Sequence, residues 1–394
     1  MARVNRKSTS PGLVVAYLLG VMGIAWSGYT FFIHPLFHPP FQYAAIEQGV
    51  VDGENKPVPI KPLVTHLSTP ASVKAVYMTS WVAGTPRIRN RLINLIDTTE
   101  LNSVVIDVKD YSGRIVFPVS DPELTATGAV EVRISDIQGL IADLHQRGIY
   151  VIGRVSVFQD AYFVSQHPEL AIHRRSDGGI WKDRKGISWL EAGSVPVWNY
   201  VLKIARAAYA VGFDEINFDY IRFPSDGNMQ DISYQYFDPT RETRAQVMKR
   251  FYAYLSQGLA SLKMPISIDL FGLTTTSLDD LGIGQVLVDA APYFDYIAPM
   301  VYPSHFASGY LNFSNPTTHP YEVVKNVMTK AGERLVVASS TTSKLRPWLQ
   351  DFNLGAIYTA DMVRAQIQAT YDSGLTSWML WDPNNQYTPE ALDK

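Results

Sequence analysis

The sequence contains no cysteine, which excludes disulfide bonds, thiolate metal sites and a cysteine nucleophile. Charged residues are also scarce at 18%, and the net charge of −3 offers no basic surface, so we expect no nucleic-acid partner. A Gly-x-Ser-x-Gly segment, the mark of one class of serine hydrolase, is absent. The 8 histidines form no closely spaced pair of ligands on a helix or strand. We therefore expect neither a catalytic metal nor a cofactor.

Apolar and aromatic residues are plentiful by comparison. Hydrophobic residues make up 46% of the 394 residues, which is typical of a folded chain and not of a disordered one. This length suffices for one large domain or two modest ones. The 8 Trp, 22 Tyr and 17 Phe suit a surface that handles carbohydrate, although a large core also uses aromatic residues.

The amino-terminal segment 1–33 is predicted to be a membrane anchor. It contains an almost uncharged apolar run from Gly12 to Ile33, which would span about 33 Å as a helix, enough to cross a bilayer. Arg3, Arg6 and Lys7 precede this run and favour a cytoplasmic amino terminus. A cleaved secretory signal is the alternative interpretation. Either way, we expect the remainder of the chain to lie outside the cytoplasm, membrane-anchored or secreted.

Residues 34–70 follow as a proline-rich linker. The prolines are spaced closely enough to break helices and to leave extended, semi-rigid chain. The domain that carries the chemistry is then predicted to comprise residues 71–394.

This domain alternates short apolar runs with amphipathic stretches. The predicted strands are 74–78, 103–108, 150–155, 215–218, 266–270, 296–300, 335–338 and 377–380, and helical stretches include 134–146, 197–210, 241–262, 321–331 and 361–371. Eight buried strands separated by helices over about 320 residues predict an α/β fold, a (β/α)8 TIM barrel. A doubly wound open sheet is the alternative, but no Gly-rich phosphate loop follows the first strand.

Active sites of such barrels lie where the strands end. The predicted fourth strand leads directly to Asp219, followed by Tyr220 and Arg222, and Asp269 ends the fifth. Acidic residues recur at the ends of strands two, four, five and eight, with aromatic residues between them, whereas the strand starts carry few acids. A buried carboxylate is costly for a fold unless it is used or paired. The asymmetry favours a functional site over a structural pairing of Asp219 with Arg222.

Several motifs resemble those of a family of glycoside hydrolases of TIM-barrel type, over roughly residues 73–381. They are VIDVKDYSG at 105–113, RVSVFQD at 154–160, Trp189, FDYIRFP at 218–224 and IAPMVYP at 297–303. One departure is that Glu191-Ala192 stand where relatives tend to have Asn or Asp followed by Pro. The resemblance implies hydrolysis of a glycosidic bond in a polysaccharide or oligosaccharide, such as a cell-wall glycan or an exopolysaccharide.

Met300-x-Tyr302 and the tryptophans Trp378 and Trp381 are also similar to chitinase-type barrels. The array of four acids on strand four that those enzymes use is absent, since only Asp214, Glu215 and Asp219 occur there. We therefore do not transfer the substrate-assisted mechanism of chitinases to this chain.

Hydrolysis of a glycosidic bond needs one carboxylic acid that protonates the leaving oxygen and a second carboxylate that attacks or activates water. Asp219 is the first candidate, and Asp269 on the next strand is the partner. Neighbouring strands lie about 5 Å apart, within reach of the roughly 5–5.5 Å separation of a retaining enzyme. We expect Asp219 to act as the nucleophile and Asp269 as the acid/base, although the sequence does not fix which does which.

The remaining candidates are substrate-binding residues. Asp107 and Lys109 could bind hydroxyl groups or tune the acid pair, with a structural ion pair as the alternative. Arg222 could orient Asp219 or bind the carboxylate of an acidic sugar. Tyr302, Trp81 and Trp381 are candidates for stacking under a sugar ring, and Trp381 could equally be a core residue.

The long segment 159–196 mixes charges with aromatic residues and is interpreted as a lid over the substrate, or else as a solvated insertion. Two functions from different classes remain at this point. One is an extracytoplasmic glycoside hydrolase. The other is a non-catalytic barrel that binds glycans or scaffolds an envelope complex. The second carboxylate distinguishes them, because a barrel in which Asp107 and Asp269 both point away from Asp219 lacks a hydrolytic pair.

Overall fold

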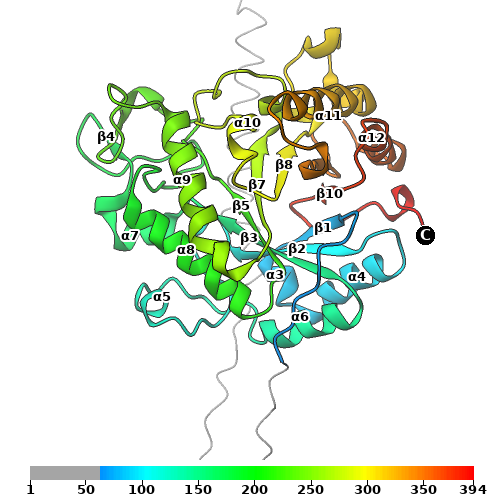
Figure 1. Cartoon of the computed structure of the whole chain (residues 1–394), viewed down its shortest axis with the longest axis horizontal. Coiled ribbons are helices and arrows are strands. Elements are labelled where there is room, and N and C mark those ends of the chain that lie inside the picture. Colours follow the sequence, from blue (N-terminus) through cyan, green and yellow to red (C-terminus); the bar gives the residue numbers. More distant parts are fainter. Residues whose placement is uncertain (1–62) are drawn as a thin grey trace, which may run out of the picture. The chain divides into compact units, whose positions relative to one another are not determined.

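Eight parallel strands close into a barrel with helices around it (Figure 1). The computed structural model describes residues 63–394. The barrel strands are β1 (Lys74–Met78), β2 (Ser103–Lys109), β3 (Tyr150–Ser156), β5 (Glu215–Asp219), β7 (Ile266–Phe271), β8 (Tyr296–Met300), β9 (Trp348–Gln350) and β10 (Trp378–Trp381). Their order around the barrel is β1-β10-β9-β8-β7-β5-β3-β2. The predicted (β/α)8 architecture is confirmed, and the open-sheet alternative is wrong.

Helices fill the connections between the strands. They are α3 (Ser80–Ala83), α4 (Pro86–Asp97), α5 (Pro122–Ala126), α6 (Ile137–Gln146), α7 (Ala161–Gln166), α8 (Val195–Ala210), α9 (Arg244–Leu259), α10 (Leu287–Ala290), α11 (Pro320–Val337) and α12 (Ala360–Asp372). In α9 the sequence determines both where the helix begins and which face it buries. Thr243 and Gln246 cap its first turn reciprocally, and Val247, Phe251 and Leu255 recur at helical spacing on its buried face.

The strands divide their side chains between two cores, because successive residues of a strand point to opposite faces. In β5, Ile216 and Phe218 join the large apolar cluster between barrel and helices. The alternating residues Glu215, Asn217 and Asp219 are buried on the other face, inside the barrel. A second, smaller apolar cluster belongs to the barrel interior and includes Tyr77, Tyr150, Ile152 and Trp348. The polar half of β5 therefore faces the interior.

Seven of the eight predicted strands agree with the structure to within two residues, but the seventh is wrong. Residues 335–338 form the end of α11 and not a strand, with Leu335 buried and Val336 and Val337 at 60% and 87% exposure. The barrel strand in this place is β9, which is three residues long. A short apolar run does not reveal whether it ends a helix or forms a strand, and three residues are too few to give a period.

The short strand β9 is held by a helix as well as by its neighbours. Its pairing with β8 is limited to Met300 opposite Trp348. Gln366 of α12 is fully buried, and its amide bonds both backbone groups of Gln350, accepting from N–H at 2.9 Å and donating to C=O at 2.8 Å. The Gln366 side chain thus provides hydrogen-bond partners for the N–H and C=O groups of Gln350, which a buried backbone requires.

A small antiparallel sheet lies outside the barrel. It pairs β4 (His173–Arg174), within the long segment after β3, with β6 (Ile232–Ser233), which follows β5. Trp181 and Trp189 of this segment are buried, at 1% and 2% exposure. Its tryptophans therefore pack inside the protein and do not form an exposed lid surface.

The described part of the chain begins within the predicted linker. Residues 63–70 form neither helix nor strand, and Leu67 packs against the apolar cluster of the barrel interior. The Leu67 N–H donates to Asp214 at 2.6 Å, at the residue before β5 begins. Among residues 63–394 no helix is both long and apolar enough to cross a membrane. The expected anchor at 12–33 lies outside the described residues.

We expect Gln366→Ala to lower the free energy of unfolding by about 2–4 kcal/mol, because it leaves two buried backbone groups of Gln350 without partners. Urea denaturation followed by tryptophan fluorescence measures this. Gln368→Ala is the matched control, since Gln368 is exposed on the same helix and bonds only Asp372. An equal, small effect of the two substitutions would contradict the role of Gln366.

Candidate active site

The carboxyl ends of β2, β3 and β5 meet at Arg154. Its Nη1 donates to Asp107 Oδ1 at 2.8 Å, and its Nε and Nη2 donate to Asp219 Oδ2 at 3.0 and 2.5 Å. All three side chains are buried, at 5%, 2% and 6% exposure for Arg154, Asp107 and Asp219. Tyr77 OH donates to the other oxygen of Asp107 at 2.7 Å. One arginine therefore bridges two acids from different strands.

Asp219 lies where β5 stops, and the backbone turns sharply there. Tyr220 has a φ of 50°, which a bulky residue rarely adopts. In this conformation the Tyr220 N–H donates to Asp219 Oδ1 at 2.6 Å. Backbone strain of this kind persists where the surroundings enforce it and is concentrated at functional sites. Both oxygens of Asp219 are consequently held by N–H donors, which fixes the orientation of its carboxyl group.

Asp269 projects from the neighbouring strand at the same level. Phe218 pairs with Ile268, so Asp219 and Asp269 come one residue further along β5 and β7. Asp269 Oδ1 accepts from Asn217 Nδ2 at 2.9 Å and from Trp348 Nε1 at 2.8 Å. Burial raises the pKa of Asp269 well above its usual range, and the charge of Asp219 raises it further. These surroundings favour the protonated form of Asp269.

Gln285 connects the ends of the two acid-bearing strands. Its side chain is 1% exposed and accepts from the Phe271 N–H at 2.9 Å. Its Nε2 donates to the carbonyl oxygens of Asp269 at 3.1 Å and of Ile221 at 3.4 Å. Three backbone groups of the two strand ends are thus fixed to one side chain, which limits relative motion of the acids.

Aromatic side chains surround the acids. Burial raises the pKa of Tyr302 well above its usual range, and the charges of Asp269 and Asp219 add to this, so the phenol lies near both carboxyl groups. Trp381 stacks on Tyr77 at a centroid distance of 4.1 Å, and the Arg154 guanidinium lies 5.1 Å from the Trp381 ring. Trp381 is partly exposed, so it borders the site and packs against the interior cluster.

The structure places the other predicted binding residues around this group. Trp81 follows β1 and is 62% exposed, with the guanidinium of Arg133 4.4 Å from its ring. Arg222 makes no hydrogen bond to Asp219; its guanidinium lies among Trp189 and two other aromatic rings. Both residues are therefore at the carboxyl end of the barrel, outside the cluster formed around Arg154.

Lys109 does not join the cluster. β2 shifts register between Asp107 and Lys109, and the Lys109 ammonium forms an ion pair with Asp160 at 2.6 Å, both side chains having no exposure. It lies 5.9 Å from the ring of Tyr200, on α8 outside the barrel. Gly113 also packs on this pair, since a Cβ there would lie 1.9 Å from Asp160 Oδ1. Asp107 and Lys109 therefore do not pair with each other: Lys109 pairs with Asp160, and Asp107 pairs with Arg154.

Sequence reasoning missed four residues of the site. They are Arg154 as the bridge, Tyr77, Asn217 and Trp348. The alternation of polar and apolar residues along β5 could have found Asn217, two residues before Asp219. Trp348 was missed because the seventh strand was assigned to 335–338, which left Trp348 in a loop.

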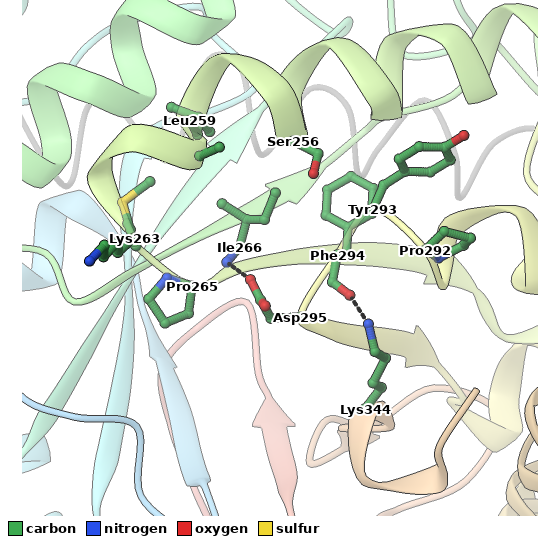
Figure 2. Close-up of a pocket in the computed structure, with 12 residues that line it drawn as sticks. Ser256, Leu259, Lys263, Pro265, Ile266, Pro292, Tyr293, Phe294, Asp295 and Lys344 are labelled. Atoms are coloured by element: carbon green, nitrogen blue, oxygen red, sulfur yellow. Dashed lines mark hydrogen bonds between the residues drawn. The ribbon is translucent and has the colours of Figure 1, made fainter. Parts of the chain in front are cut away.

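A pocket of about 320 Å³ lies at the opposite end of β7 (Figure 2). It is lined by residues that include Ile266, Asp295 and Lys344. Asp295 accepts from the Ile266 N–H at 2.9 Å, and Lys344 donates to the carbonyl oxygens of Phe294 and Ala291. Asp295 and Lys344 are thus engaged in hydrogen bonds to the backbone. Across residues 63–394, no group of three or more His, Asp or Glu side chains is arranged to hold a metal ion.

Comparison with known proteins agrees with this geometry. Residues 75–387 match a family model described as "Putative glycosyl hydrolase domain". No curated protein matches the chain significantly. Among solved structures, the glycoside hydrolase domain of PgaB (BpsB) from Bordetella bronchiseptica superposes with a TM-score of 0.58 at 12% identity, over 79% of this chain and 94% of that one. This likeness shows a common fold.

Two further solved structures are similar over part of the chain. A hypothetical protein from Ruminiclostridium thermocellum ATCC 27405 is 29% identical, with a TM-score of 0.44, over 53% of this chain and 98% of that one. An exo-β-N-acetylglucosaminidase from Vibrio harveyi is 12% identical, with a TM-score of 0.49, over 82% of this chain and 51% of that one.

We expect Lys109→Met to lower the free energy of unfolding by about 3–5 kcal/mol, because it leaves the buried Asp160 carboxylate without its cation. Urea denaturation measures the loss. The double variant Lys109→Met/Asp160→Asn should recover part of it, since no lone charge remains and Asn retains the cap on α7. A Lys109→Met protein of unchanged stability that no longer binds glycans would instead assign Lys109 to the substrate.

Proposed function

Because this chain belongs to the "Putative glycosyl hydrolase domain" family, we propose that it hydrolyses a polysaccharide with Asp219 and Asp269 as its acid pair. One observation carries the proposal. Two carboxyl groups stand level on adjacent strands at the carboxyl end of the barrel; Asp219 contacts the cation Arg154, whereas burial raises the pKa of Asp269. Hydrolysis of a glycosidic bond needs such a pair.

In this proposal Asp269 is the general acid. Both N–H donors that contact its carboxyl group bind Oδ1, and within the described residues Oδ2 has no hydrogen-bond partner. Oδ2 is therefore the atom that carries the proton and faces the glycosidic oxygen. Protonation of that oxygen lets the bond to the sugar break without expelling an alkoxide.

Asp219 is the second carboxylate. Arg154 and the Tyr220 N–H hold its two oxygens by hydrogen bonds and thereby fix its orientation as the proposed nucleophile. Strands β5 and β7 are hydrogen-bonded neighbours, about 4.8 Å apart. This spacing suits the roughly 5–5.5 Å separation of retaining enzymes better than the wider gap of inverting ones. We therefore propose a covalent glycosyl intermediate on Asp219.

Asp107 has an indirect role here. It holds Arg154 from the side opposite Asp219 and thereby positions the guanidinium. Trp381 is partly exposed and offers aromatic surface beside Arg154, which suits the apolar face of a sugar ring, whereas Tyr302 is only 6% exposed and belongs to the barrel interior. The non-catalytic alternative has less support, because glycan binding alone does not require two buried carboxyl groups level on adjacent strands, one of them paired with an arginine.

The location and the class of glycan remain proposals that rest on the sequence. The apolar run 12–33 and the positive residues before it favour a membrane anchor or a secretory signal. An enzyme tethered in this way would act on a cell-wall glycan or an exopolysaccharide. Fractionation of cells that express the full chain, with protease protection of the barrel, tests this.

We expect the full-length chain to release products from at least one member of a panel of bacterial polysaccharides. Asp269→Asn should lower kcat by about 10²–10⁴-fold, because it removes the proton donor, and Asp219→Asn should lower it at least as much. NMR of the first product should show retention of the anomeric configuration. The control is Asp295→Asn, at the far end of β7.

Turnover by Asp219→Asn at the wild-type rate would remove Asp219 from the mechanism. An inverted product would exclude it as the nucleophile. Glycan binding by all variants without any product would favour the non-catalytic barrel.

The pH profile tests the assignment of the proton to Asp269. Activity requires the protonated form, so kcat/KM should fall as the pH rises through the raised pKa of Asp269. Trp348→Phe removes a hydrogen bond that favours the ionised form, which raises this pKa further and moves the fall to higher pH. Trp378→Phe is the control, because it loses an indole bond to Tyr371 away from the acids. If Trp348→Phe does not change the pH at which kcat/KM falls, the catalytic proton belongs to a group other than Asp269.

A further inference from the structure

Arg222 is held in a pocket of aromatic rings at the mouth of the barrel. Its guanidinium lies 4.6 Å from the ring of Phe271, 4.9 Å from Trp189 and 5.4 Å from Tyr220. These rings come from the end of β7, from the segment between β3 and α8, and from the turn after β5. The side chain is 8% exposed. Three separate segments therefore fix its position, next to both acid-bearing strands.

Arg222 differs from the other deeply buried arginines because it has no carboxylate partner in the described part of the chain. Arg154 pairs with two carboxylates, and Arg346, at 1% exposure, pairs with Glu215 at 2.8 Å. Burial lowers the pKa of Arg222, as expected of a cation removed from water without a contacting anion. Such a group is costly to bury, and its cost falls when an anion binds.

The hydrogen bonds of Arg222 leave one edge of the guanidinium free. Nη1 donates to the carbonyl oxygen of Phe223 at 3.0 Å and to Ser225 Oγ at 3.2 Å. Nε and Nη2 donate to no acceptor among residues 63–394. Neither nitrogen is fully buried, so a ligand can reach both. Together Nε and Nη2 present two parallel N–H groups, the arrangement that receives both oxygens of one carboxylate.

The charges nearby limit which anion can bind. Asp219, Asp226 and Asp183 lie close enough to influence Arg222 but do not contact it. Their negative potential opposes a phosphate dianion more strongly than a carboxylate with a single charge. The aromatic walls exclude water and strengthen the remaining attraction. A planar, singly charged group fits this site best.

We propose that the Nε and Nη2 edge of Arg222 binds the carboxylate of a uronic-acid residue in the glycan, at the sugar adjacent to the bond that Asp219 and Asp269 cleave. This inference rests on the proposed function. Arg222 is three residues after Asp219, and Phe271 is two residues after Asp269, so the anion site is attached to both halves of the acid pair. The enzyme is thereby specific for an acidic polysaccharide.

Binding is measured with the full-length chain carrying Asp269→Asn, which prevents turnover. Affinity electrophoresis uses polygalacturonate, hyaluronate and alginate, each beside its carboxyl-reduced form. We expect at least one acidic polymer to bind at least tenfold more tightly than its reduced form. Adding Arg222→Gln should abolish this preference and leave binding of the reduced polymer unchanged. Arg222→Lys should restore little, because an ammonium lacks the two-pronged edge.

Arg244→Gln is the matched control. It removes a positive charge that also lies near aromatic rings, 5.6 Å from Phe223, and it should leave the preference intact. The proposal is overturned if Arg222→Gln keeps the preference, if no acidic polymer binds better than its reduced form, or if inorganic phosphate competes as well as galacturonate. The wild type could also show an Arg222-dependent preference for an acidic polymer and yet release no product. That result would contradict the proposed hydrolase activity and support the acidic-glycan site.

Discussion

The contact of Arg154 with Asp107 and Asp219 determines the electrostatics of the whole cleft. Three carboxyl groups, including Asp269, surround a single cation in a buried site. If all three were ionised, the cluster would carry two excess negative charges away from water, which is strongly unfavourable. Arg154 supplies one positive charge to the two carboxyl groups that it contacts. Burial and the charge of Asp219 raise the pKa of the third, Asp269, so the arrangement of charges favours a protonated Asp269.

This arrangement depends on a rigid layer beneath it. Glu215 lies on the same face of β5 as Asp219, and it is bonded by Arg346, Ser267 and Tyr150 at distances of 2.6–3.1 Å. Arg346 also lies 3.9 Å from the ring of Tyr296. The barrel interior is therefore built from ionic and polar contacts below the acids as well as at their level. This buried network favours one register of the strands, and within the described residues it leaves Nε and Nη2 of Arg346 without a hydrogen-bond partner.

The sequence was sufficient for the fold because the period of the apolar residues is strong in seven strands and in the long helices. It failed at β9, where three residues are too short for a period and where Gln366 supplies contacts that no local pattern reveals. For the site, strand ends led to Asp107, Asp219 and Asp269. The sequence could not show that Lys109 turns outward, because this follows from a register shift in β2.

Burial raises the pKa of Asp107 as well, but we propose Asp269 as the proton donor because the contacts of the two carboxyl groups differ. Asp107 receives Arg154 on one oxygen and Tyr77 on the other, which leaves neither oxygen free to present a proton to a substrate. Asp269 receives both of its donors on Oδ1 and contacts no cation in the described chain. Hydrogen bonds to one oxygen fix the orientation of a carboxyl group. The other oxygen, which has no hydrogen-bond partner, can still donate its proton to a substrate. Of the two acids with raised pKa values, only Asp269 meets both conditions, and Asp107 serves to fix the arginine.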